Sequence, residues 1–192
     1  MISNLYFILF NTFWLLFITE HIGTTVKDED QAQRIYASVM IISVVFGTVG
    51  MPLLGMFCDK VSPTISIPTA FFVRAIAMLL FMLVQDPTTV YSYLVSVFMI
   101  FGTIFEGIAT VSMVFRIADR EIRGVMSGLM NSTGYVGQLI FCLAGGFLFD
   151  YVSIYAPFVF VGACDVLFGI TAIIAGRAGI LTDDHAGRVL NE

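Results

Sequence analysis

Gly55-Met56-Phe57-Cys58-Asp59-Lys60-Val61-Ser62-Pro63 lies between two long apolar runs and contains the adjacent charges Asp59 and Lys60. This stretch indicates the end of one membrane helix, a short charged turn where the bilayer meets water, and the start of the next helix. Glycines in the preceding run, such as Gly50, allow helix backbones to approach closely. Pro63 suits the first turn of a helix. The stretch therefore predicts a helical hairpin around which the other segments alternate.

The composition indicates an integral membrane protein. Of the 192 residues, 58% are hydrophobic and only 12% are charged, whereas soluble domains are about half apolar and about a quarter charged. The three cysteines lie in or beside apolar runs, without the spacing of a disulfide framework or a metal site. Sequence motifs of phosphate loops, zinc proteases or redox enzymes do not occur, and no basic patch suggests nucleic-acid binding. We expect no enzyme activity, no cofactor, no metal and no nucleic-acid partner.

Six apolar runs are long enough to cross a bilayer, which requires roughly 20 residues each. They are approximately Ile2–Thr19, Ile35–Phe57, Ile65–Val84, Val90–Phe115, Gly124–Phe149 and Tyr155–Ala175. The sequence predicts an all-α membrane fold, with six transmembrane helices within residues 1–176 and a polar cytoplasmic tail over residues 177–192. The first run starts at Met1 without a polar leader and barely reaches spanning length. That start favours the interpretation that the chain is part of a longer protein.

The loop charges predict the orientation, because cytoplasmic loops are enriched in Lys and Arg. One side of the alternation carries six basic residues and the other carries two. The six are Lys60, Arg116, Arg120, Arg123, Arg177 and Arg188, and the two are Lys27 and Arg34. We therefore expect both termini and the Asp59-Lys60 turn to face the cytoplasm or its equivalent, and the acidic loop at residues 28–30 to face outward.

Six helices with both ends inside, joined by this hairpin, resemble one half of a major facilitator superfamily transporter. The cytoplasmic signature of that family is Gly, three residues, Asp, Arg or Lys, one residue, and then Gly and basic residues. Gly55, Asp59 and Lys60 match it, whereas Ser62 replaces the second Gly and the residues after it are not basic. A half-kept signature is frequent in the C-terminal half of such transporters.

A second resemblance lies in residues 120–128, where a charged loop leads into a Gly-rich helix, as at the fifth helix of such a half. The resemblance implies that Asp59 meets the positive N-terminal end of the helix beginning near Gly124. Arg123 or Arg120 would be its ionic partner, and this contact would hold one conformation of an alternating-access cycle. The alternative is that Asp59 and Lys60 are solvated charges at the membrane surface.

Three charged residues, Arg74, Glu106 and Asp165, fall inside apolar runs, where a charge costs roughly 2.5–3.5 kcal/mol on insertion scales. Arg74 and Glu106 lie about 15 and about 14 Å from the cytoplasmic ends of consecutive helices. A buried ion pair between them is therefore plausible, and Asp165 could pair with a neighbour such as Arg74. Glu106 either lines a cavity, where it binds substrate or couples protons, or only neutralises Arg74; the sequence leaves both readings open.

Polar residues at helical spacing indicate cavity-facing or interior surfaces on two helices. The fourth run carries such a stripe at Thr103, Glu106, Thr110 and Met113, and the fifth carries Asn131, Tyr135, Gln138 and Cys142. These spacings of three and four place each set on one helix face. Hydrogen bonds between helices, without a ligand, would use the same residues.

Together these features predict the C-terminal six-helix half of a twelve-helix major-facilitator-type bundle. The expected function is transmembrane transport of a small solute by alternating access. The expected partners are the lipid bilayer, the solute and a second six-helix half, either a missing N-terminal half or a second copy. The alternative function is that of a non-transporting structural or assembly subunit in a larger membrane complex.

Overall fold

The computed structural model describes residues 2–118 and 121–178, and for residues 2–10 and Ile117 it describes the backbone alone. Each of the six predicted runs forms a helix. The helices are α1 (Ile2–Glu20), α2 (Glu29–Lys60), α3 (Pro63–Leu80), α4 (Val90–Ile117), α5 (Arg123–Tyr151) and α6 (Ala156–Arg177), with a short 3-10 helix, η1 (Phe81–Leu83), after α3. Most of the predicted polar tail, residues 179–192, lies outside the described residues.

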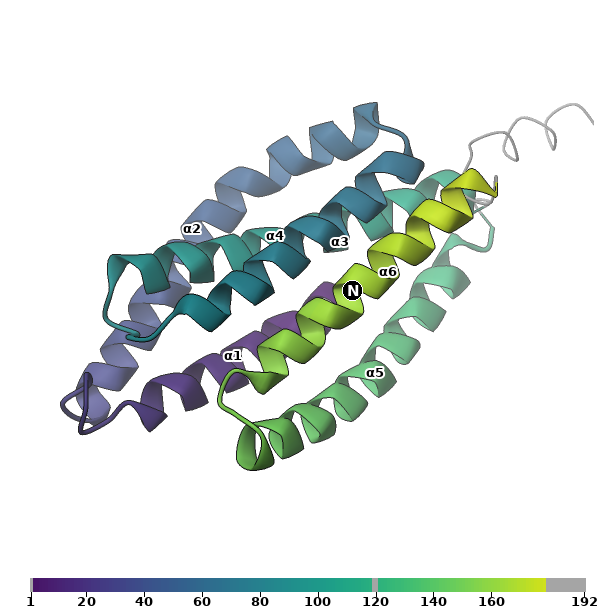
Figure 1. Ribbon diagram of the computed structural model, residues 1–192. Coiled ribbons are helices and arrows are strands. Elements are labelled where there is room, and N and C mark those ends of the chain that lie inside the picture. Colours follow the sequence, from purple (N-terminus) through teal and green to yellow (C-terminus); the bar gives the residue numbers. More distant parts are fainter. Residues whose placement is uncertain (1, 119–120, 179–192) are drawn as a thin grey trace, which may run out of the picture.

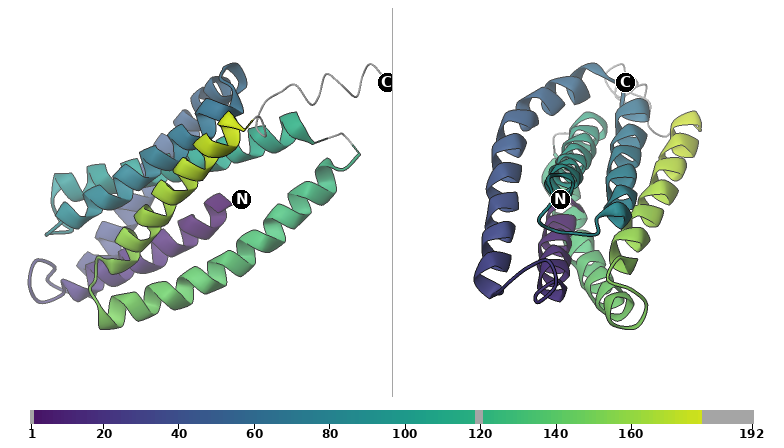
Figure 2. Two further views of the ribbon diagram at one scale, coloured as in Figure 1. Left: turned by 45° about the vertical axis from the view of Figure 1, so that its right-hand side comes forward. Right: turned by 60° about the vertical axis from the view of Figure 1, so that its left-hand side comes forward.

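The helices form a bundle in which consecutive helices alternate with helices from distant parts of the chain (Figures 1 and 2). Going round the bundle, α2 packs on α4, α4 on α3, α3 on α6, α6 on α5, α5 on α1, and α1 on α2. α1 also contacts α4 across the middle, and α3 has the most extensive packing of all, against α6 and α4. α3 is therefore the centre of the tightly packed part of the bundle, whereas α2 and α5 are the most open elements.

Local capping residues determine where the helices start. The Asp28 carboxylate accepts a hydrogen bond of 2.8 Å from the backbone N–H of Gln31, which satisfies an N–H that the first turn of α2 leaves without a partner. α2 therefore starts at Glu29, not at the predicted Ile35, and the loop before it is shorter than expected. Thr89 caps α4 in the same way, and Pro63 occupies the first position of α3.

Five of the described helical segments are long and apolar enough to cross a membrane: α2, α3 together with η1, α4, α5 and α6. α1 is not one of them. It has 19 residues and lies against α5, α4 and α2.

Two apolar clusters hold the bundle together at its two ends. Near the α3–α4 turn, Trp14 and Phe158 pack on Phe81, with ring centroids 5.2 and 4.1 Å from that ring. Near the hairpin, a smaller cluster forms around Leu54 and Phe105. Burying large aromatic side chains stabilises such contacts by dispersion and ring geometry. Arg74 on α3 and Asp165 on α6 lie between the residues that the two clusters take from these helices, whereas Glu106 on α4 lies within the second cluster, next to Phe105.

A row of glycines spaced seven residues apart allows α6 to lie directly on α3. A Cβ atom placed on Gly162 would lie 3.2 Å from the Cβ of Met78, and one on Gly169 would lie 3.0 Å from the Phe72 ring. Gly176, one repeat further on, faces Thr64 in the same way. Seven residues are two helical turns, so the three glycines share one face. The α3–α6 contact is therefore close along its whole length.

Candidate functional site

Arg116, in the last turn of α4, holds the carboxyl end of α2. Its Nη1 donates to the carbonyl oxygen of Val61 at 3.2 Å, and its Nη2 donates to those of Cys58 at 2.6 Å and Asp59 at 2.5 Å. The last carbonyl groups of a helix lack partners within the helix and carry a negative partial charge, so a guanidinium satisfies them. Arg116 therefore fastens the end of α4 to the charged hairpin; we call these three hydrogen bonds the Arg116 clamp.

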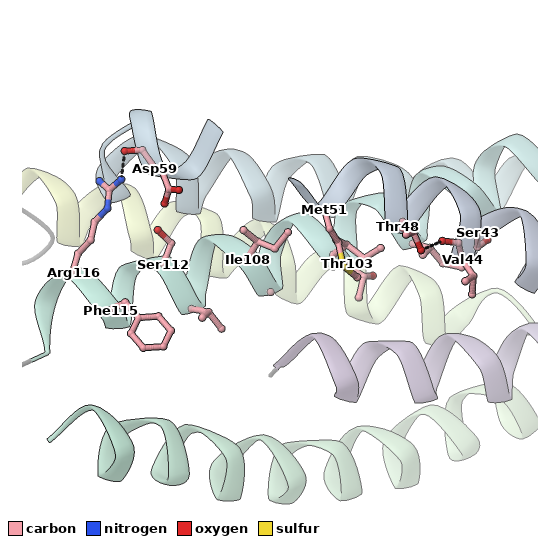
Figure 3. A pocket seen from close by; sticks show the side chains of 15 residues that line it. Ser43, Val44, Thr48, Met51, Asp59, Thr103, Ile108, Ser112, Phe115 and Arg116 are labelled. Carbon is pink, nitrogen blue, oxygen red and sulfur yellow. Dashed lines mark hydrogen bonds between the residues drawn. The ribbon is translucent and has the colours of Figure 1, made fainter. Parts of the chain in front are cut away.

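A groove of about 760 Å³ lies between α2 and α4 (Figure 3). Most of its wall is apolar. The apolar lining comes from Val44, Gly47, Met51, Ile100, Ile104, Gly107, Ile108, Val111 and Phe115. A volume of this size is typical of small-molecule sites, whose linings are mainly apolar with a few well-placed polar groups.

The polar residues of the groove gather at its two ends, with Met51 and Ile108 between them (Figure 3). At the hairpin end lie Asp59, Ser112 and Arg116. Toward the other end lie Ser43, Thr48 and Thr103. The groove thus has a charged end at the hairpin and an uncharged polar end around Ser43.

The hydroxyl of Ser43 stands out among the groove's polar atoms. Thr48 and Thr103 donate to carbonyl oxygens of their own helices, those of Val44 at 2.8 Å and Met99 at 2.9 Å. Ser43 is only 1% exposed, yet its Oγ has no hydrogen-bond partner among the described residues. A buried hydroxyl without a partner costs free energy. The groove wall therefore contains one unsatisfied polar atom.

Arg74, Glu106 and Asp165 form one buried charge network that joins α3, α4 and α6. Nε and Nη2 of Arg74 donate to the two oxygens of Asp165, the first at 2.8 Å, and Nη1 donates to Oε2 of Glu106 at 3.0 Å. Thr110 supplies a further contact, 3.3 Å from its Oγ1 to Oε1 of Glu106. All three charged side chains are essentially inaccessible. The guanidinium thus satisfies two carboxylates from two different helices.

This charge network does not line the groove. α4 presents Thr103 and Gly107 to the groove, whereas Glu106 and Thr110 belong to the network. With about 3.6 residues per turn, positions three apart are displaced around the helix, and here that displacement is enough to separate two sites. The predicted single stripe from Thr103 to Met113 is therefore divided between them.

The family model described as Major Facilitator Superfamily matches residues 1–185, nearly the whole chain. The chain belongs to the major facilitator superfamily. It is accordingly a multi-pass integral membrane protein of a transporter family, whose members are transporters and not enzymes.

One curated relative gives a shorter match. Over 56 residues the chain is 41% identical to "Magnetosome protein MamH" of Paramagnetospirillum magneticum (strain ATCC 700264 / AMB-1). The match covers 29% of this chain and 13% of that protein, so the two share only a short aligned segment. No solved structure matches the chain significantly.

In this major-facilitator chain, the arginine that contacts the signature hairpin is Arg116, through the three hydrogen bonds of the clamp. Arg123, one of the predicted partners of Asp59, instead donates from its Nε to the carbonyl oxygen of Ala118 at 2.9 Å. The other predicted partner, Arg120, lies outside the described residues. Lys60 is exposed at the end of α2. The sequence could have indicated this role, because Arg116 directly follows the apolar run Val90–Phe115 and is therefore expected on the same side of the membrane as the hairpin.

The glycines of the two family signatures have open space around them. A Cβ atom on Gly55 or on Gly124 would meet no atom within 4 Å among the described residues. No other helix of the described part comes close to either glycine. Their role in the conformational contact at the hairpin stays a prediction.

The polar face of α5 stands apart from the groove. Tyr135 is 61% exposed, Asn131 and Gln138 are half-buried, and none of the three lines the groove. The Oδ1 atom of Asn131 is buried without a partner in the described part of the chain. Within residues 2–118 and 121–178, no group of three or more His, Cys, Asp or Glu side chains is placed to hold a metal ion.

Proposed function

We propose that residues 1–176 form one six-helix half of a secondary transporter that moves a small solute by alternating access. A second six-helix half, an N-terminal half or a second copy of this chain, completes the solute path. The observation that carries this proposal is the groove between α2 and α4, which has an apolar wall and polar groups at both ends. In transporters built from repeats, the binding site lies between the two halves.

The Arg116 clamp supports a specific gating step. It ties the two walls of the groove together at the hairpin end, through hydrogen bonds to carbonyl groups at the end of α2. Opening this end moves α2 away from α4 and breaks the clamp, and closing it restores the three bonds. In this proposal α2 moves relative to α4 within one half, and this movement accompanies the rocking of one half against the other.

The open faces of α2 and α5 support the presence of a second half. Val45 and Val49 on α2, and Leu139 and Leu143 on α5, are all more than half exposed. Apolar faces of this kind are covered by lipid or by other helices. In the proposed assembly the second half covers both faces and closes the open side of the groove.

Gating by the clamp is tested with cysteine reporters at the two ends of the groove, introduced into a chain whose native cysteines are replaced. Arg116→Gln removes the charged donor, and hydrogen bonds to charged groups contribute about 1.5–3 kcal/mol. We expect labelling of Ser112→Cys from the hairpin face of reconstituted vesicles to rise about tenfold. Labelling of Ser43→Cys from the opposite face should fall, because both reporters follow one conformational equilibrium.

Arg123→Gln is the matched control, because it also removes a guanidinium near the end of α4, but one that donates to the Ala118 carbonyl and to no group of α2 among the described residues. It should leave both labelling rates nearly unchanged. If Arg116→Gln raises labelling at both reporters equally, the clamp only supports the fold. The chain would then fit the alternative of a non-transporting structural or assembly subunit better.

The proposed topology is tested by the side from which single cysteines are labelled. Asp28 and Ser62 flank the two ends of α2, whose 32 residues extend about 48 Å, more than the roughly 30 Å of a bilayer core. We expect cysteines at Ser62 and Asp119 to be labelled from one side and a cysteine at Asp28 from the other; Asp119 lies outside the described residues. Labelling of Asp28→Cys and Ser62→Cys from the same side would contradict the topology.

A further inference from the structure

A proline divides α2 in its second half. Pro52 lies inside this helix, and residues 53–60 follow it. A proline has no backbone N–H, so the Thr48 carbonyl cannot receive the helical hydrogen bond that position 52 would otherwise donate. Sharp helix bends occur mostly at such positions, and α2 bends toward α3 near its hairpin end (Figure 2). We call residues 29–51 the long segment of α2 and residues 53–60 its end segment.

Two neighbours of Pro52 weaken the same part of the helix. The Thr48 hydroxyl donates to the Val44 carbonyl at 2.8 Å, and a bond of this kind often bends a helix. Gly50 also disfavours the helix relative to alanine, because glycine loses more backbone freedom on folding. α2 therefore resists bending least around residues 48–52.

α4 holds the two segments by separate contacts. The long segment lies close on α4, since a Cβ atom on Gly47 would be 2.7 Å from Cδ1 of Ile104. The end segment is held by the buried side chains of Leu54 and Cys58 and by the Arg116 clamp, whose acceptors are the carbonyls of residues 58, 59 and 61. Every bond of the clamp thus lies beyond Pro52, and the long segment can stay on α4 when the clamp breaks.

A small bend is enough to release the clamp. At about 1.5 Å per residue the end segment is about 12 Å long, so a bend of about 15° at Pro52 moves its end by about 3 Å. This displacement away from α4 takes the three carbonyl oxygens out of hydrogen-bonding range of Arg116. Only Val61 and Ser62 join the end segment to α3, and so short a link keeps the movement small.

We infer that Pro52 is the hinge at which the hairpin end of the groove opens: the end segment tilts away from α4 and back, while the long segment stays on α4. This inference rests on the proposed transport function, because it names the part of α2 that moves in the gating step. A rigid movement of the whole helix would instead carry Gly47 away from Ile104 while it breaks the clamp.

The test fixes the long segment and asks whether the end segment still moves. Gly47→Cys and Ile104→Cys are oxidised to a disulfide in the full chain, in which both cysteines other than Cys58 are replaced by alanine. Cys58 is only 2% exposed, so its rate of reaction with a small maleimide in reconstituted vesicles reports tilting of the end segment. Arg116→Gln should raise this rate about tenfold, and the rise should persist after the disulfide has formed.

Pro52→Ala supplies the missing N–H and lets the helical hydrogen bond to the Thr48 carbonyl form. In the cross-linked chain it should abolish most of the rise that Arg116→Gln causes, because the end segment then moves only with the long segment. Leu53→Ala is the matched control, since it changes the neighbouring exposed side chain, keeps the proline and should leave the rise unchanged. If Pro52→Ala does not fold, the cross-linking result alone decides.

Loss of the rise on cross-linking alone would mean that α2 moves as one body, and a rise that survives cross-linking together with Pro52→Ala would place the bend elsewhere. Either result overturns the inference, and so does a chain without the disulfide in which Arg116→Gln leaves the Cys58 rate unchanged. Any of these results with reciprocal labelling of Ser43→Cys and Ser112→Cys intact leaves the transport proposal standing. Loss of the reciprocal labelling defeats the transport proposal, whatever Cys58 does.

Discussion

Arg74→Leu is expected to be the most damaging single substitution in this protein. It removes the only guanidinium that the described structure brings to Glu106 and Asp165, and leaves two carboxylates buried together. Breaking a buried ion pair typically costs about 3–5 kcal/mol, and here two carboxylates lose their partner at once. We expect the variant to fail to accumulate as a folded protein, or to lose most of its thermal stability in detergent, measured by temperature-dependent gel filtration.

Recovery should require that all three charges are replaced. Arg74→Leu with Glu106→Leu still leaves Asp165 buried without its partner, so this double variant should remain unstable. Adding Asp165→Leu removes the last charge and should recover much of the stability, because buried ion networks are often replaceable by apolar groups. If the double variant is as stable as the triple variant, Asp165 is not part of the network in the membrane.

The same variants separate packing from transport at Glu106. Under the transport proposal, a network that only holds α3, α4 and α6 together predicts that the triple variant recovers solute uptake by the complete transporter as well as stability. Uptake that stays lost in a stable triple variant would assign Glu106 a role in coupling or in solute binding. The complete burial of all three side chains and their absence from the groove favour recovery of both properties.

Gly102→Ala is expected to have the second largest effect. A Cβ atom at this position would lie 2.9 Å from the Cα and 3.1 Å from the Cβ of Arg74. The obstacle is backbone, which cannot rotate away like a flexible side chain, so α3 and α4 must separate and the Arg74 guanidinium must shift. Overpacking of this kind costs about 1–3 kcal/mol. The measurement is again thermal stability in detergent.

Gly128→Ala on α5 is the control for helix propensity, because a Cβ there meets no atom within 4 Å among the described residues. Alanine favours helix over glycine by about 1 kcal/mol, so Gly128→Ala should be neutral or slightly stabilising. Equal behaviour of the two alanine variants would mean that α3 and α4 are not closely packed at Gly102.

Much of the fold could be predicted because the membrane imposes a simple rule. Apolar runs of about 20 residues cross a bilayer as helices, which satisfy their backbone groups within the run, and all six runs are helical. The apolar runs do not predict helix ends that depend on capping residues. The Asp28 cap starts α2 at Glu29, six residues before the predicted run that begins at Ile35. The pairing of Arg74 with Glu106 followed from similar depth on consecutive helices, and the structure joins them at 3.0 Å.

The parts that could not be predicted depend on which helices become neighbours. Apolar runs do not say that α6 lies on α3, so the sequence named Arg74 only as one possible neighbour of Asp165, and the structure forms that pair. Arg123, predicted as a partner of Asp59, instead contacts Ala118, whereas Arg120 lies outside the described residues. The arginine that the structure brings to the hairpin is Arg116, and its acceptors are backbone carbonyls. The helical spacing on α4 also placed Thr103 and Glu106 on one face, whereas in the structure Thr103 lines the groove and Glu106 belongs to the charge network.

The seven-residue glycine row on α6 has a consequence for how the protein is made. Helices leave the ribosome in chain order, yet α3 receives its closest neighbour last, and Arg74 meets Asp165 only 91 positions later in the chain. Until α6 arrives, the Arg74 guanidinium has Glu106 but lacks Asp165, and the α3 surface around Phe72 lacks the cover that Gly169 of α6 gives it. α6 therefore completes both the charge balance and the packing of this bundle in one step. A chain whose synthesis stops before α6 lacks both the second carboxylate partner of Arg74 and the helix that packs on α3.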